Sequence, residues 1–170
     1  MKSNTTKNLI IITGASCNGK TYITSKLTEK FLFYTIHADS LYAPIGGGGH
    51  GLKIGVEDEE KVKYIKEHKV NLTQNNILEG AYFGNSKEIN IWTKHLDIDG
   101  RIIILEVKSP NFEKWVQTKY GEAVEPQGCL DYYKSFADIN PDAIISTHEE
   151  AIKFLNEKDG TLCIPRLHNN

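Results

Sequence analysis

The sequence predicts an α/β fold in which helices cover both faces of a parallel β-sheet. Short apolar runs alternate along the 170 residues with segments of helical periodicity, an order typical of βαβ units. Several of these runs are continuously apolar, as expected for strands that are buried on both faces. The length favours a single domain that spans residues 1–170.

Five apolar runs are predicted to form the strands of the sheet. They are short, and each is separated from the next by enough chain for a crossover connection, which parallel strands require. In chain order they are Asn8–Thr13, Leu32–Ile36, Asn76–Gly80, Arg101–Val107 and Ala143–Ser146.

Helical periodicity marks the stretches between these runs. In the first stretch, Ile23, Leu27 and Phe31 recur at every fourth position, which places them on one face of a helix. The other stretches carry apolar residues among charged ones in the same way. The predicted helices span Lys20–Phe31, Glu57–His68, Ser86–Leu96, Asn111–Tyr120 and His148–Glu157.

Two segments lack a clear period. Residues 40–55 contain a run of glycines, which permit many backbone conformations and are costly to order. We interpret this stretch either as a flexible surface loop or as a flap that closes over substrate. The tail, residues 158–170, is predicted to be irregular and loosely packed.

Composition narrows the range of partners. The formal net charge is −2, from 20 Lys and Arg against 22 Asp and Glu, which does not favour nucleic acid as a partner. Three cysteines are too few for a disulfide framework or a zinc site and indicate a reduced, cytoplasmic setting. The apolar run at residues 9–12 is too short for a membrane span. For the oligomeric state, the sequence leaves both a monomer and a homodimer open.

The motif with the clearest chemistry is GASCNGKT, which fits the pattern G-x-x-x-x-G-K-S/T and lies between a predicted strand and a predicted helix. Its glycines let backbone N–H groups turn toward a phosphate, and the helix N-terminus attracts the same anion. The lysine supplies a cation to the phosphates, and the threonine hydroxyl is a ligand for Mg²⁺. The predicted nucleotide-binding residues are Gly14, Ala15, Ser16, Cys17, Asn18, Gly19, Lys20 and Thr21.

With this motif the sequence resembles the small P-loop kinases, which include gluconate and shikimate kinases, chloramphenicol phosphotransferase and nucleotide kinases. The resemblance covers about Asn8–Asn156 by the order of elements and is specific at Gly14–Thr21. It implies a three-layer P-loop NTPase fold whose five parallel strands have the order 2-3-1-4-5. It also implies an ATP-dependent phosphotransferase that uses Mg²⁺.

One candidate carboxylate follows a predicted strand and a second lies at the end of one, where ligands bind in sheets of this type. The resemblance implies that Asp39 holds or deprotonates the acceptor hydroxyl, although a helix N-cap would also explain an Asp there. It implies that Glu79 supports either Mg²⁺, together with Thr21, or the acceptor, and the two carboxylates could exchange roles. The predicted catalytic residues are therefore Lys20, Asp39 and Glu79, with Glu106 as a lower-ranked acidic candidate.

The expected lid departs from the pattern of these kinases, many of which clamp the phosphates with arginines after the fourth strand. The sequence has only two arginines, Arg101 and Arg166, and neither lies in that region. Lys114 and Lys119 are the lid candidates, although a lysine lacks the bidentate fork of an arginine. Solvated helix lysines are the alternative interpretation.

The sequence leaves the acceptor open. A hydroxyl or phosphate of a nucleoside, a nucleotide or a sugar-like molecule all fit, and DNA ends or modified bases are a further variant. A nucleotide-binding regulatory module, or an NTPase without a small-molecule acceptor, is the alternative class of function. A signalling GTPase is disfavoured because no base-reading Asn-Lys-x-Asp motif is present.

Overall fold

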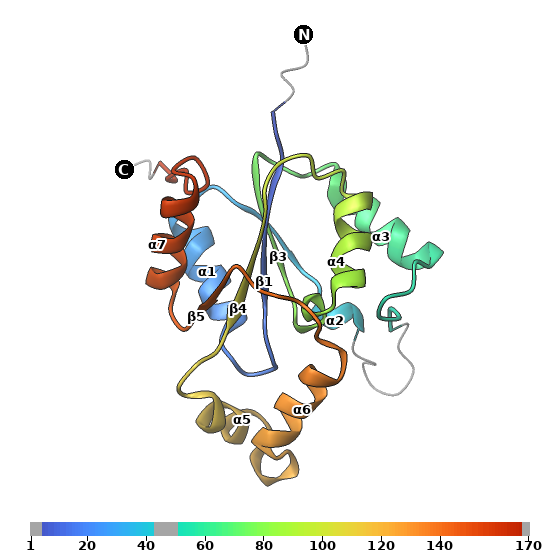
Figure 1. Ribbon diagram of the computed structural model, residues 1–170, viewed down its shortest axis with the longest axis vertical. Helices are drawn as coiled ribbons and strands as arrows, with labels where there is room; N and C mark the ends of the chain where they lie inside the picture. The colour runs from blue at the N-terminus through green and yellow to red at the C-terminus, as the bar shows by residue number, and fades with distance from the viewer. Residues whose placement is uncertain (1–4, 43–50, 168–170) are drawn as a thin grey trace.

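A computed structural model describes residues 5–42 and 51–167 of the chain. Its centre is a parallel five-stranded sheet with the order β2-β3-β1-β4-β5, which confirms the order implied by the kinase resemblance (Figure 1). The strands are β1 Asn8–Thr13, β2 Tyr34–His37, β3 Asn75–Glu79, β4 Ile102–Val107 and β5 Ala143–Ile145.

Strand β1 lies in the middle of the sheet and is buried along its whole length, which explains its continuous apolar run. Its register places Ile12 beside Glu79 of β3 and Thr13 beside Glu106 of β4. His37 of β2 pairs with Glu79 in turn. The carboxyl ends of these strands therefore meet at one edge of the sheet, where ligands bind in open α/β folds.

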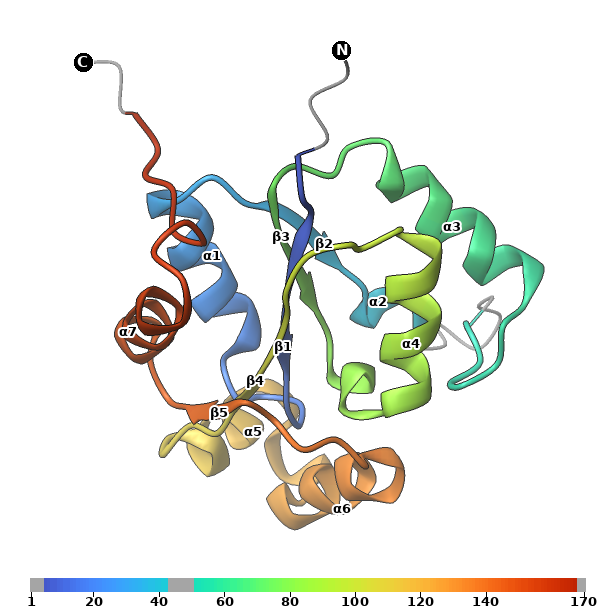
Figure 2. The ribbon, with the colours of Figure 1, turned by 45° about the horizontal axis from the view of Figure 1, so that its top comes forward.

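Helices cover both faces of the sheet, so the predicted three-layer arrangement is confirmed. Figure 2 shows α1 (Lys20–Lys30) and α7 (His148–Lys158) on one side, with α3 (Glu59–Lys69) and α4 (Ser86–His95) on the other. The remaining elements gather at the carboxyl ends of the strands. They are the short helices α2 (Asp39–Tyr42) and η1 (Ala81–Gly84), then α5 (Phe112–Tyr120), η2 (Gly121–Ala123) and α6 (Pro126–Phe136).

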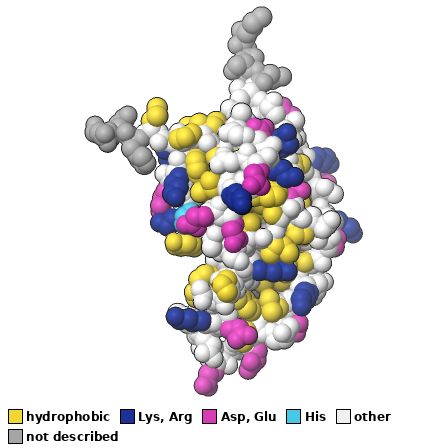
Figure 3. Space-filling view, turned by 60° about the vertical axis from the view of Figure 1, so that its left-hand side comes forward, with side chains coloured by type: hydrophobic (Ala, Val, Ile, Leu, Met, Phe, Trp, Pro, Cys, Tyr) yellow, Lys and Arg dark blue, Asp and Glu magenta, His cyan; other side chains and the backbone are white. Residues whose placement is uncertain are grey.

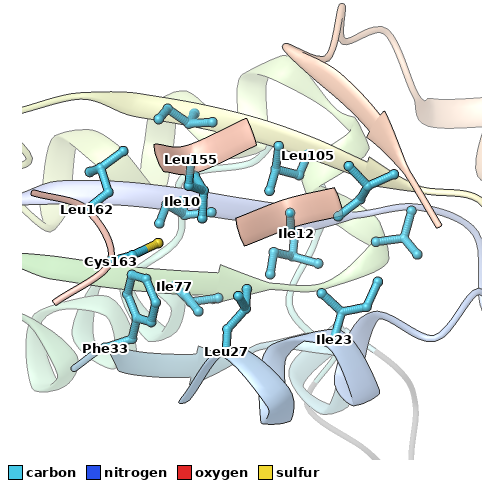
Figure 4. Close-up of a cluster of buried hydrophobic side chains, with 14 residues drawn as sticks. Ile10, Ile12, Ile23, Leu27, Phe33, Ile77, Leu105, Leu155, Leu162 and Cys163 are labelled. Carbon is cyan, nitrogen blue, oxygen red and sulfur yellow. The ribbon is translucent and has the colours of Figure 1, made fainter. Parts of the chain in front are cut away.

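Side chains of β1 alternate between two hydrophobic clusters. Ile10 and Ile12 belong to the cluster under α1 and α7, in which Leu155 of α7 packs against the sheet (Figure 4). Leu9 and Ile11 belong to the cluster under α3 and α4. Each such buried aliphatic side chain stabilises the fold by about 1.5–3 kcal/mol relative to its exposed form. The two clusters hold the sheet as a rigid base for its strand ends.

The sequence did not predict α2 or α6. The breakers Pro126 and Gly128 interrupt the periodicity that would have marked α6. In the structure the proline stands at the first turn, where its missing N–H costs nothing, and the glycine is exposed. Residues 40–42 lie inside the predicted Gly-rich segment but belong to the helical turn Asp39–Tyr42.

The tail packs more tightly than expected. Leu162 and Cys163 are buried in the cluster under α1 and α7, and Pro165 forms a bridge with Phe31. The N–H of Arg166 also donates to the carbonyl of Lys30 at 2.9 Å. The predicted loose packing is therefore wrong for Leu162 and Cys163, while Pro165 and Arg166 are exposed.

The Gly-rich loop is anchored at both of its described ends, while residues 43–50 lie outside the described residues. Lys61 of α3 and Glu88 of α4 form a fully buried ion pair at 2.7 Å. The same carboxylate accepts hydrogen bonds from the Tyr42 hydroxyl and from the N–H of Gly55, each at 2.5 Å. These contacts tie Tyr42 and Gly55 to α4, and the choice between a flexible loop and a flap for residues 40–55 stays a prediction.

The surface mixes both signs of charge. On the face in Figure 3, Lys and Arg side chains alternate with Asp and Glu, so the described part of this face lacks the single-sign basic patch typical of nucleic-acid binding. Within residues 5–42 and 51–167, no helix combines the length and apolar character needed to cross a bilayer.

Candidate active site

The motif loop turns sharply between β1 and α1. Gly14 has φ 140°, Cys17 has φ 65° and Gly19 has φ 84°. A Cβ atom on Gly14 would lie 2.6 Å from the carbonyl oxygen of Val107, and one on Gly19 would lie 2.9 Å from the Trp115 ring. Both glycines are therefore required by backbone conformation and by space, while Cys17 is strained because it is not a glycine.

Helix α1 begins at this loop without a side-chain cap. Gly19 is its N-cap and provides no side-chain acceptor for the first N–H groups of the helix. These amides and the positive end of the helix dipole point out of the helix toward the loop. An anion held there would satisfy them, which is the arrangement that the motif predicts for phosphate binding.

Side chains of the loop brace it against the segment after β4. Asn18 is buried; its amide donates to the carbonyl of Ala15 at 3.3 Å, and its Oδ1 accepts from the N–H of Ser109 at 2.9 Å. The hydroxyl of Ser16 lies 3.4 Å from that of Tyr120 in α5. Asn18 receives no individual role from the sequence, whereas in the structure its hydrogen bonds hold the loop against the segment after β4.

Lys20 is 5% exposed, and its ammonium donates to the carbonyl of Ala15 at 3.0 Å. Burial lowers the pKa of Lys20, and the nearby carboxylates of Asp39 and Glu79 oppose this shift. Three predicted catalytic residues from α1, α2 and β3 therefore interact electrostatically within one site.

Glu79 links the loop helix to β2. Its Oε1 accepts from the Thr21 hydroxyl at 2.9 Å, and its Oε2 contacts Nδ1 of His37. A hydroxyl and a carboxylate are hard oxygen ligands of the kind that Mg²⁺ prefers, so both residues fit such an ion. In the described ranges no group of three or more His, Cys, Asp and Glu side chains could hold a metal alone, so phosphate and water oxygens would complete the set.

Asp39 opens α2 and is oriented by a neighbouring segment. Its Oδ1 accepts from the N–H of Ala81 at 2.7 Å, not from an amide of its own helix, so the N-cap interpretation is wrong. A Cβ atom on Gly80 would lie 2.9 Å from that oxygen, so the glycine makes room for the contact. Burial raises the pKa of Asp39, and the Lys20 ammonium only partly offsets this rise.

Two cavities meet at this site. The P-loop cavity, about 770 Å³, is lined by residues 16–23 together with Trp115 and residues 146–149. The α6 cavity, about 570 Å³, lies between η1, α5 and α6. Ser16, Asp39 and Lys119 line both cavities. Asp39 therefore stands where the two cavities join.

The lid candidates differ from each other. Lys119 lines both cavities, and its ammonium lies 5.1 Å from the centre of the Tyr120 ring. Burial lowers the pKa of Lys119, but Tyr120 and Asp39 raise it more, so the pKa lies above its usual value. Lys114 is exposed and lines neither cavity. Glu106 also lines neither, and it pairs with Lys108 at 3.7 Å.

Sequence reasoning missed several residues of the site. His37 receives no role from the sequence, although its place at the end of β2 could have signalled that it lies at the ligand-binding edge of the sheet, where it contacts Glu79. Residues 146–149, which line the P-loop cavity, could have been found in the same way because they directly follow β5. Tyr82, which follows β3, lines the α6 cavity, while Phe83 and Trp92 are buried in the core.

Comparison by sequence is uninformative, because no protein-family model and no curated protein matches the chain. Comparison by structure finds solved relatives of similar size. A gluconokinase from Sinorhizobium meliloti has a TM-score of 0.60 and 13% identity, covering 91% of this chain and 95% of its own. A sugar kinase from Janibacter has a TM-score of 0.52 and 14% identity, covering 89% and 93%.

A third similar structure is the YorR protein from Bacillus subtilis in complex with phosphorylated GDP. Its TM-score is 0.58 at 13% identity, and the match covers 90% of this chain and 98% of that one. Identities this low establish the fold alone. The chain therefore has the fold of the small P-loop kinases, as its motif and element order implied.

Proposed function

We propose that the chain is an ATP-dependent kinase that transfers the γ-phosphoryl group to a hydroxyl group of a small molecule. The observation that carries this proposal is the position of Asp39, which lines the P-loop cavity and the α6 cavity at once. A hydrolase needs space for a water molecule, whereas a second cavity of about 570 Å³ provides space for an acceptor.

The P-loop side supplies positive charge. Bound ATP with Mg²⁺ supplies the phosphoryl group and an electrophilic phosphorus. The backbone amides at the start of α1 and the ammonium of Lys20 stabilise the negative charge on the transferring group. The Thr21 hydroxyl and the Glu79 carboxylate are the side chains that would hold the ion.

Asp39 acts on the acceptor. It accepts the proton as the acceptor O–H bond breaks, the acceptor oxygen bonds to the γ-phosphorus, and ADP leaves with the electron pair of the broken phosphoanhydride bond. The raised pKa of Asp39 makes it a stronger base than an ordinary aspartate. The N–H of Ala81 fixes one carboxylate oxygen and leaves the other for the acceptor.

A screen with γ-labelled ATP tests the proposal. Nucleosides, nucleotides, sugars and oligonucleotides are each incubated with enzyme, and label on the acceptor is separated from inorganic phosphate. We expect label on at least one small hydroxyl-bearing acceptor, and none with Lys20→Ala protein purified in parallel. Release of inorganic phosphate alone, whatever the acceptor, would replace the proposal with a hydrolase or a regulatory module.

A further inference from the structure

The α6 cavity points to a class of acceptor. We infer that the acceptor is an uncharged molecule of nucleoside size, built on a flat ring, which packs against Tyr132 and directs a hydroxyl group toward Asp39. The inference rests on the proposed kinase activity for the fate of that hydroxyl, while the binding it describes can be measured without turnover.

The cavity is walled by aromatic rings that hold one another in place. Tyr82 is half-buried between Tyr42 and Phe136, with ring centroids 4.7 and 5.2 Å from its own. Its hydroxyl lies 3.0 Å from that of Tyr132, whose ring also packs edge-on against Phe136. Tyr132 is nevertheless 58% exposed. Its orientation is therefore fixed while much of its ring remains free to contact a ligand.

A second exposed ring comes from another helix that lines the cavity. Tyr120, at the end of α5, is 37% exposed and lines the same space as Tyr132 of α6. Rigid aromatic side chains give a flat ligand large contact area at small cost in conformational entropy. Two such rings favour an acceptor with a planar ring over a compact aliphatic alcohol.

Charge argues against an acidic acceptor. Among the described residues that line the α6 cavity, Lys119 is the single cation, and it is shared with the P-loop cavity. Both arginines are engaged elsewhere: Arg101 pairs with Asp159, and Nε of Arg166 donates to the carbonyl of Thr28. Residues 43–50 contain no Lys or Arg in the sequence. A phosphate or carboxylate beside Asp39 would therefore meet repulsion with little compensation.

The polar groups that remain are neutral hydroxyls. Ser16, Ser40 and the tyrosines can donate to or accept from a ring edge or a sugar hydroxyl. Burial raises the pKa of Tyr82, which keeps its hydroxyl uncharged. The volume of about 570 Å³ is in the range of pockets that enclose small organic ligands. These features fit an unphosphorylated nucleoside better than a nucleotide or a sugar acid.

Matched ligands test the inference. Adenosine, guanosine, cytidine and thymidine are each compared with the corresponding 5′-monophosphate and with gluconate, by calorimetry in the presence of a non-hydrolysable ATP analogue. We expect at least one nucleoside to bind about tenfold or more tightly than its monophosphate and than gluconate. Tighter binding of a monophosphate or of gluconate, or binding of none of the nucleosides, overturns the inference.

Variants at Tyr132 locate the binding. Tyr132→Leu should weaken nucleoside binding about tenfold, since an aromatic contact with a base is worth roughly that much, while affinity for the ATP analogue stays constant. Tyr132→Phe keeps the ring and should stay within about threefold of the original protein. Unchanged nucleoside binding in Tyr132→Leu overturns the proposed place of the ring.

The two proposals fail in different ways. If nucleosides bind in this pattern but never acquire label from ATP, the kinase proposal fails and the binding inference stands. If label appears only on phosphorylated or carboxylated acceptors, the kinase proposal stands and the acceptor class inferred here is wrong.

Discussion

The P-loop cavity and the α6 cavity meet at Asp39 but are built from different parts of the protein. The P-loop side is shaped by main chain, through three residues with positive φ and a helix that begins without a side-chain cap. The α6 side is shaped by side chains, chiefly aromatic ones from η1, α5 and α6. A site shaped by the main chain tolerates few residue types at fixed positions, whereas a site shaped by side chains can be built from many different residues. Substitutions on the two sides should therefore act on different ligands.

The largest expected effect is a difference in kcat/KM among alanine variants of Lys20, Lys119 and Lys114. Lys20→Ala should lower kcat/KM by about a hundredfold to a thousandfold, because Lys20 is buried and lines the proposed phosphate site. Lys119→Ala should cost about tenfold, because its charge is more exposed. Lys114→Ala should leave kcat/KM unchanged. Steady-state kinetics and calorimetry with ATP check all three values.

If Lys114→Ala lowers kcat/KM as much as Lys119→Ala does, then α5 must adopt a second position in which Lys114 reaches the site. Equal and small effects of Lys20→Ala and Lys114→Ala would remove Lys20 from the chemistry altogether.

Asp39→Asn should separate the acceptor reaction from ATP binding. The amide keeps an oxygen for the N–H of Ala81 but cannot take a proton, so kcat should fall about a hundredfold while ATP affinity changes little. In the original protein the rate should fall about tenfold per pH unit below the raised pKa of Asp39. The test is the acceptor-dependent rate, measured between about pH 4 and 8, because the titration of a carboxylate with a raised pKa can be followed in that range.

Stability gives an independent check of Asp39. Its folded pKa is raised, so its ionisation destabilises the fold above that pKa and the penalty disappears as the pH falls through it. Asp39→Asn should therefore unfold at an equal or higher temperature at neutral pH, and the difference should vanish in acid. A lower unfolding temperature at neutral pH would reassign the carboxylate to a structural role.

Gly84→Ala should act on the α6 side alone. A Cβ atom there would lie 2.6 Å from the Tyr133 ring, so α6 must shift. We expect about 1–3 kcal/mol of destabilisation and a several-fold rise in the KM for acceptor, with the KM for ATP unchanged. Gly160→Ala is the matched control, since nothing lies within 4 Å of its Cβ position. An equal rise in both KM values would show that the two cavities are mechanically coupled.

The smallest effect concerns the strained loop residue. Cys17 has φ 65°, so Cys17→Gly should stabilise the protein by about 0.5–1 kcal/mol in a denaturant titration. Cys129→Gly, inside α6, should instead destabilise it by about 1 kcal/mol. Shifts of the same sign in both variants would mean that the loop conformation at Cys17 carries no strain.

The difference between the cavities also explains what the sequence could predict. The P-loop was recognisable because glycines at two fixed positions are required by φ values and by contacts with Val107 and Trp115. The strand order followed from the resemblance that this motif supported. The location in the cell and the oligomeric state remain predictions.

The α6 cavity left no comparable pattern. Tyr82, Tyr132 and Phe136 come from two elements about fifty residues apart, and one of these, α6, was hidden by Pro126 and Gly128. The pairing of His37 with Glu79 depends on register between β2 and β3, which local periodicity does not encode. The end of β2 marks His37 as a residue near the crevice, but its contact with Glu79 and the aromatic wall of the α6 cavity became visible only in the tertiary structure.

The uncapped start of α1 has a practical side for anyone who purifies this protein. The open amides of the proposed phosphate site would not distinguish a triphosphate from simple oxyanions, so we expect sulfate or phosphate in a storage solution to compete for the same place. The apparent strength of nucleotide binding will then vary with the choice of salt. Exchange into a chloride buffer before each titration avoids this competition, so the measured affinity for nucleotide is that of the protein alone.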